Sequence, residues 1–173
     1  MGKDNKIREY VEYPKKYYNL LIHKNKRKEE KKIIKIIAST PVFSTYYYHL
    51  VSRIIKLSRN AKVLDIGCAQ GGFLNFIKQI RPDLKLYGTD LTDVKNKLPK
   101  GILFIKADII NDQIKEKDFD LITCRHLIEH LQVNDVPNLF NKCYSLLKRG
   151  GHFFVLCPEY SKKFYNDPTH IRP

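Results

Sequence analysis

The sequence has no tryptophan, only one methionine and few acidic residues, with 18 Asp and Glu against 32 Lys and Arg. It also lacks any apolar run approaching the roughly 18 residues that a membrane-spanning helix needs, which excludes a transmembrane protein. No apolar stretch follows the charged residues at the N-terminus, so we expect no secretory signal there. These absences predict a cytoplasmic protein.

Cysteine is scarce as well, and its spacing excludes the usual metal-binding pairs. The chain has four cysteines, which lie too far apart for any Cys-x-x-Cys pair and fall in apolar or strand-like surroundings. We therefore predict reduced and mostly buried thiols at these positions: Cys68, Cys124, Cys143 and Cys157.

Positive charge is what the sequence has in excess, and most of it lies in the first third. The formal net charge is +14. Residues 1–60 carry 15 basic and 5 acidic side chains, against 17 and 13 in residues 61–173. Such a charge suggests a nucleic acid, an acidic membrane surface or a phosphorylated substrate as partner. We expect residues 1–60 to form a basic, helical N-terminal extension that packs on a domain formed by residues 61–173.

The chain is long enough for one hydrophobic core, and its apolar spacing predicts an α/β fold. An amphipathic helix is predicted from Thr40-Pro41 to about Ser58. Beyond it, two helices alternate with apolar runs; Pro82 ends the first, and the second is capped by Asn134 and closed at Lys148-Arg149-Gly150. The predicted strands are 62–66, 84–88, 102–106, 119–123 and 151–157. This alternation predicts a doubly wound, mainly parallel five-strand sheet with N-terminal helices.

Acidic residues and a glycine-rich turn fall at the carboxyl ends of these strands, where open parallel sheets bind their ligands. The turn from Gly67 to Gly72 lets backbone N–H groups approach a ligand closely. Asp90, after the second strand, can accept both hydroxyls of a ribose, and Asp108, after the third, can accept an exocyclic amine. Together these features predict an adenosine pocket.

The same segments resemble the five motifs of class I S-adenosylmethionine-dependent methyltransferases, in the right order, over residues 62–158. They are 63–73 (VLDIGCAQGGF), 88–91 (GTDL), 106–109 (KADI), 119–122 with 128–131 (FDLI and IEHL) and 146–151 (LLKRGG). The resemblance implies a Rossmann-like methyltransferase core in residues 61–173 with S-adenosylmethionine as cofactor. Because the sequence stops soon after the fifth strand, we expect the two antiparallel strands that family members add there to be absent.

Carried over position by position, the resemblance assigns residues to parts of the cofactor. The turn residues would bind the methionine moiety, Asp90 the ribose hydroxyls and Asp108 the adenine amine. Asp65 would orient the turn or reach the amino group of the ligand through water. The complete implied set is Asp65, Gly67, Cys68, Ala69, Gly71, Asp90, Leu91, Asp108, Ile109 and Arg125, with Leu91 and Ile109 holding the adenine ring. Ala69 departs from the family, since most members have glycine there.

Two other classes of site fit parts of the sequence. The spacing Gly67-x-Ala69-x-x-Gly72, followed by Asp90, satisfies a relaxed dinucleotide fingerprint and hence an NAD-linked oxidoreductase, but it predicts neither Asp108 nor a Glu-His pair after the fourth strand. The segment 126–130 (HLIEH) matches the inverted zinc-protease signature. Zinc hydrolysis needs those ligands on a full helix, whereas this segment directly follows a predicted strand.

The segment 126–130 also offers groups for methyl transfer. Within the resembling family, quinol-type O-methyltransferases carry acidic residues and a histidine here, which implies catalytic roles for His126, Glu129 and His130. Two histidines and a carboxylate could deprotonate an acceptor hydroxyl or hold a divalent ion against it. We hypothesise that His126 is the base, and the sequence assigns no metal ligand.

The C-terminal string 167–173 (DPTHIRP) resembles strings that follow the fifth strand in methyltransferases encoded with glycan-assembly enzymes. The resemblance implies that His170 and Arg172 contact an acceptor, with Arg172 suited to an anionic group.

The acceptor stays open between several classes. The segment 124–127 (CRHL) matches neither the motif of enzymes that methylate exocyclic amines of bases nor a Pro-Cys nucleophile, so we predict O-methylation of a small molecule, glycan or lipid head group. Tyrosines interleaved with lysines in residues 10–18 keep a ribose of RNA or DNA as an alternative acceptor. A third hypothesis is a cofactor-binding subunit without chemistry of its own. We also expect that a homodimer could form through the exposed sheet edge or the N-terminal helices.

Overall fold

The computed structural model describes residues 45–158 and 167–171, and the chain divides into two compact units, residues 1–56 and 57–173. In the first unit, α3 (Thr45–Ile55) is an amphipathic helix whose Leu50, Val51 and Ile54 are buried. The predicted start of this helix at Thr40-Pro41 and the remainder of the predicted N-terminal extension lie outside the described residues.

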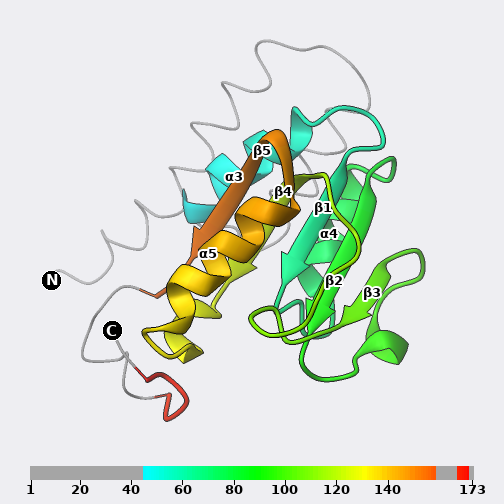
Figure 1. The fold of residues 1–173 in the computed structure, drawn as a ribbon. Helices are drawn as coiled ribbons and strands as arrows, with labels where there is room; N and C mark the ends of the chain where they lie inside the picture. The colour runs from blue at the N-terminus through cyan, green and yellow to red at the C-terminus, as the bar shows by residue number, and fades with distance from the viewer. Residues whose placement is uncertain (1–44, 159–166, 172–173) are drawn as a thin grey trace, which may run out of the picture. The chain divides into compact units, whose positions relative to one another are not determined.

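A five-stranded, entirely parallel sheet forms the centre of the second unit (Figure 1). Its strand order is β3-β2-β1-β4-β5, so β1 lies in the middle and pairs with both β2 and β4. The strands are β1 (Lys62–Ile66), β2 (Lys85–Asp90), β3 (Leu103–Lys106), β4 (Phe119–Arg125) and β5 (Leu147–Leu156). This arrangement confirms the predicted doubly wound sheet with a Rossmann-like order.

Two helices connect strands of the sheet, and Figure 1 shows α4 (Gly72–Ile80) behind β1 and β2 and α5 (Asp135–Leu146) in front of β4 and β5. Alternate residues of β1 face the two helical layers, one formed by α4 and the other by α5, as expected for a strand that is covered on both sides. Leu64 and Ile66 belong to the core cluster that includes residues of α5. Asp65 is fully buried on the opposite face of β1.

The structure corrects the predicted junction between the last helix and the last strand. α5 ends at Leu146 and β5 begins at Leu147, so Lys148-Arg149-Gly150 lie in the strand. Leu147 pairs with Phe119, and the register then shifts before Leu121. A Cβ on Gly151 would lie 2.7 Å from the carbonyl oxygen of Phe119. The glycines therefore serve an irregular strand start rather than a helix C-cap.

The predicted cap of α5 is also wrong in its chemistry. Asn134 occupies the N-cap position, but it has helical dihedral angles and its side chain makes no capping hydrogen bond. Side-chain capping needs an extended backbone at this position, which the preceding turn at Gln132 and Val133 does not give.

The cysteines agree with the sequence prediction in most respects. All four are free thiols, and three of them are buried, whereas Cys157 is exposed just after β5. Within the described ranges, no helix combines the length and apolar character that crossing a membrane requires.

Candidate active site

Because all five strands are parallel, their carboxyl ends lie on one side of the sheet (Figure 1). The described site residues lie at or just after these strand ends or in the C-terminal segment 167–171. They form two groups in the sequence. The first follows β1, β2 and β3 and contains the glycine-rich turn with its acids. The second follows β4 and is joined by the C-terminal segment 167–171.

The glycine-rich turn is held against the end of β2 by backbone hydrogen bonds. The N–H groups of Gly67 and Cys68 both donate to the carbonyl oxygen of Thr89, at 2.9 and 3.0 Å. Gly67 and Gly71 have left-handed φ values of +68° and +73°, which glycine adopts without strain. Ala69 has φ +45°, so this alanine carries the strain that the glycine found in most family members avoids.

Asp90 fixes the turn from the end of β2. One of its carboxylate oxygens accepts the N–H of Ala69 at 3.0 Å, and the other accepts the N–H of Thr92 at 3.0 Å. The side chain is half-buried, and the next residue, Leu91, is 67% exposed. A carboxylate and an exposed apolar side chain therefore stand side by side in the chain, as the predicted ribose and adenine contacts require.

Asp108 stabilises its own turn after β3. Its two oxygens accept hydrogen bonds from the side chain of Asn111 and the backbone N–H of Ile110, both at 2.8 Å. These bonds, the one from Asn111 above all, lower the pKa of the Asp108 carboxyl. The neighbouring Ile109 is buried in the core cluster and differs in this from the exposed Leu91.

Asp65 lies beneath the site and pairs with β4, not with the turn that the sequence led us to expect. Its carboxylate accepts hydrogen bonds from the hydroxyl of Thr123 at 2.7 Å and from Nη2 of Arg125 at 2.9 Å. Thr123 is the register partner of Asp65, which explains why their side chains meet on one face of the sheet. The Arg125 guanidinium also covers the ring of Phe73 at 3.9 Å. Arg125 thus neutralises a buried charge at the floor of the site.

Cys68 has a packing role in the turn. It is 3% exposed, and burial raises the pKa of its thiol to about 12, so the thiol stays protonated at neutral pH. Its sulfur lies so close to β2 that a Cβ on Gly88 would be 2.7 Å from Sγ. Gly88 is therefore required for the turn to close against the strand.

The residues after β4 form the second group. His126 has a left-handed φ of +52° directly after the strand, and its N–H donates to the carbonyl oxygen of Leu156 at 2.8 Å. Its side chain is 56% exposed, and Nδ1 lies 3.5 Å from Oε1 of Glu129. Strained backbone of this kind concentrates at functional sites.

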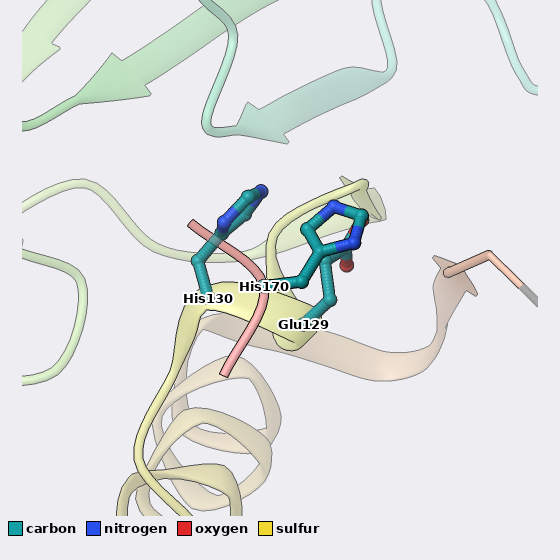
Figure 2. Close-up of side chains that lie close together, drawn as sticks. All are labelled: Glu129, His130 and His170. Atoms are coloured by element: carbon teal, nitrogen blue, oxygen red, sulfur yellow. The ribbon is translucent and has the colours of Figure 1, made fainter. Parts of the chain in front are cut away.

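Glu129 and His130 lie on the three-residue 3₁₀ turn η2 (Ile128–His130), where Glu129 is buried. This short turn overturns the zinc-protease alternative, which needs a full helix. The segment 167–171 runs beside it, since the N–H of Ile171 donates to the carbonyl oxygen of Glu129 at 3.0 Å. Figure 2 shows the side chains of Glu129, His130 and His170 close together at this place.

The sequence placed His170 near an acceptor but did not predict that it lies close to Glu129 and His130, with one ligand atom of each residue within 4.8 Å of the others. The ring centroids of His130 and His170 are 5.0 Å apart. This proximity is hard to predict because His130 and His170 lie 40 positions apart in the chain. Only the resemblance of the string 167–173 indicated a functional role for the C-terminal segment. Arg172 lies outside the described residues.

The first group fits the cofactor that the motifs imply. The left-handed glycines of the turn, a carboxylate at the end of β2 and the exposed Leu91 are groups that suit a nucleoside with an attached amino acid.

Comparison with known proteins shows the family. A family model described as a methyltransferase domain matches residues 42–167. The phosphoethanolamine N-methyltransferase of Plasmodium falciparum is 34% identical over 108 residues, which are 58% of this chain and 40% of that protein. The carboxy-S-adenosyl-L-methionine synthase of Campylobacter hominis is 27% identical over 121 residues, 65% of this chain and 49% of that protein. The chain thus spans less than half the length of these relatives.

Solved structures agree in fold. An S-adenosylmethionine-dependent methyltransferase from Archaeoglobus fulgidus superposes with a TM-score of 0.60 at 25% identity, covering 91% of this chain and 67% of that one. The plantazolicin methyltransferase BpumL, solved with S-adenosylhomocysteine, shares the fold with a TM-score of 0.52 at 22% identity, over 88% of this chain and 60% of its own. The domain match decides against the NAD-linked alternative. The chain therefore belongs to the class I family of S-adenosylmethionine-dependent methyltransferases, with S-adenosylmethionine as the methyl donor.

Proposed function

We propose that this methyltransferase methylates a hydroxyl group of a small acceptor, with His126 as the general base. When bound, S-adenosylmethionine supplies the methyl group from its sulfonium sulfur. The observation that carries the proposal is the pair after β4, in which an exposed imidazole stands 3.5 Å from a buried carboxylate. A carboxylate beside one ring nitrogen favours the tautomer in which that nitrogen carries the proton, and the other nitrogen can then act as a base.

Proton transfer follows from the positions of these two residues. Nδ1 of His126 lies 3.5 Å from Oε1 of Glu129. In the proposed reaction, the neutral imidazole carries its proton on Nδ1, next to the carboxylate, and Nε2 keeps the lone pair that accepts a proton. The acceptor hydroxyl gives its proton to Nε2 as its oxygen attacks the methyl carbon. Glu129 then stabilises the imidazolium that forms. No covalent intermediate with the protein is needed.

A second candidate acceptor is an amine that carries a phosphate. It is favoured by the similarity to phosphoethanolamine N-methyltransferases, which includes 32% identity over 110 residues with one from Arabidopsis thaliana. An ammonium group must also lose a proton before it attacks, so the same base would serve. The excess of basic residues in the sequence suits an acceptor with a phosphate group.

The remaining hypotheses depend on parts that the structure does not describe. The tyrosine-rich basic segment 10–18, which favoured a nucleic acid, lies outside the described residues, as does Arg172. A homodimer and a non-catalytic accessory subunit stay predictions.

The base is tested with labelled S-adenosylmethionine, the small-molecule fraction of a cell extract and, separately, phosphoethanolamine as acceptors. Mass spectrometry of the labelled product distinguishes an O-methyl from an N-methyl product. With the acceptor so identified, we expect His126→Ala to lower kcat by about 10²- to 10⁴-fold. The KM for S-adenosylmethionine should change little.

The matched control is His152→Ala, which removes an exposed histidine from β5 and should leave kcat unchanged. An undiminished kcat in His126→Ala would reject the general base. An N-methylated product would reject O-methylation and support the second candidate acceptor, an amine that carries a phosphate.

A further inference from the structure

The cluster after β4 contains a buried carboxylate that lacks the partners such groups normally have. Glu129 is 3% exposed, and neither of its carboxylate oxygens accepts a hydrogen bond from any described residue. Nδ1 of His126 lies 3.5 Å from Oε1, which is longer than an ordinary hydrogen bond. A buried carboxylate without donors is strongly unfavourable, so such groups are normally paired or coordinate metal ions.

Two histidines stand beside this carboxylate. One ligand atom from each of Glu129, His130 and His170 lies within 4.8 Å of the others (Figure 2). Ligand atoms at about 2.1 Å from a tetrahedral ion are roughly 3.4 Å apart, so small side-chain rotations bring the three onto one ion. We infer that Glu129, His130 and His170 form a binding site for one divalent transition-metal ion.

Both imidazoles are oriented as metal ligands are. Nδ1 of His130 lies 3.1 Å from the carbonyl oxygen of Thr169, which can only accept, so Nδ1 is the protonated nitrogen and Nε2 keeps its lone pair. Nε2 of His170 lies 3.6 Å from Oδ2 of Asp167. Histidine ligands typically direct their second nitrogen at a backbone carbonyl or a carboxylate in this way.

The chemistry of the donors selects the class of ion. Two imidazoles and one carboxylate suit Zn²⁺, Co²⁺ or Fe²⁺, whereas Mg²⁺ and Ca²⁺ prefer oxygen ligands. Three protein ligands leave coordination positions open, which an oxygen atom of an acceptor could occupy. The site itself does not depend on the proposed reaction, because an ion can bind in the absence of both methyl donor and acceptor.

The test uses the 173-residue chain without an affinity tag, freed of metal with a chelator and titrated with Co²⁺. We expect one Co²⁺ per chain, seen as visible ligand-field absorption, with displacement by Zn²⁺ but not by a tenfold excess of Mg²⁺. Zn²⁺ should also raise the unfolding temperature of the wild type, since an ion that binds only the folded state stabilises it.

Glu129→Gln and His170→Ala should each weaken Co²⁺ binding at least tenfold and remove the stabilisation by Zn²⁺. His152→Ala, which lies on β5, should bind like the wild type. Binding of S-adenosylhomocysteine, measured by calorimetry, should persist in all variants and shows that they are folded. Absence of stoichiometric Co²⁺ binding, equal binding by His170→Ala, or displacement by Mg²⁺ would overturn the inference.

Discussion

Asp90 shows how single side chains join the parts of the cofactor site. Its carboxylate accepts backbone N–H groups from Ala69 in the glycine-rich turn and from Thr92 beyond β2. The same oxygens retain lone pairs, which the ribose hydroxyls of the methyl donor would use. A change at this position should therefore weaken ligand binding, both directly and through the turn that Asp90 holds.

We predict that Asp90→Ala weakens the binding of S-adenosylhomocysteine by about 10- to 100-fold, because the loss of one hydrogen bond to a charged group costs roughly 1.5–3 kcal/mol. Isothermal titration calorimetry measures the dissociation constant directly. Asp93→Ala is the matched control, since Asp93 is exposed and caps the N–H of Lys95. Similar affinities for the two variants would reject the role of Asp90.

Single residues also mark the limits of prediction from sequence. Asp90, Asp108 and the glycine-rich turn could be placed because each lies at or just after the end of a strand, and chain order then fixes their position at the carboxyl ends of the sheet. The contact partners of Asp65 could not be predicted, since they depend on the register between β1 and β4. His170 reaches Glu129 only through the path of the C-terminal segment, which no local pattern encodes.

At the scale of elements, strands and helices followed the apolar periodicity closely, and the exception was the junction of α5 and β5. There the helical spacing of apolar residues continues into Leu147, but the pairing of Leu147 with Phe119 takes the chain into the sheet. Local propensity is overridden by tertiary pairing in such places. The sequence also could not predict where elements pack closely against one another. The clearest case is Gly88 of β2, which packs against Cys68 and Leu74.

Gly88→Ala should destabilise the protein by about 1–3 kcal/mol, as overpacked core positions do. The added Cβ would lie 2.7 Å from Sγ of Cys68 and 2.9 Å from Cδ1 of Leu74, which separates β2 from the turn and from α4. Urea unfolding gives the change in free energy.

The control for this variant is Gly72→Ala at the first position of α4. A Cβ there meets nothing within 4 Å, so helix propensity should make the change neutral or slightly stabilising. Adding Cys68→Ala to Gly88→Ala should recover part of the lost stability. Equal unfolding free energies for Gly72→Ala and Gly88→Ala would show that the packing argument is wrong.

At the scale of the whole molecule, the reactivity of three buried thiols shows whether the core is folded. Cys68 is buried in the glycine-rich turn, Cys124 in β4 and Cys143 in α5, and desolvation raises the pKa of each. Cys157 is exposed beyond β5. Only the thiolate reacts with disulfide reagents, so burial and a raised pKa both slow the reaction.

In the native protein, we expect one thiol per chain to react rapidly with an aromatic disulfide reagent at pH 8, and the other three to react only on unfolding. Absorbance of the released thiolate counts them. Cys157→Ser should abolish the rapid phase and leave the slow one intact. Rapid reaction of three or four thiols in the wild type would contradict the buried positions of these side chains.

The pairing of Asp65 with Thr123 and Arg125 has a consequence for synthesis on the ribosome. β1, β2 and β3 emerge first and can align with one another, but the partners of the buried Asp65 carboxylate are residues of β4. At about 5–20 residues per second, several seconds of translation separate β1 from β4. If β1, β2 and β3 assembled alone, the Asp65 carboxylate would lack its partners until β4 was made, which favours completion of the sheet as one cooperative step over stepwise folding from the N-terminus.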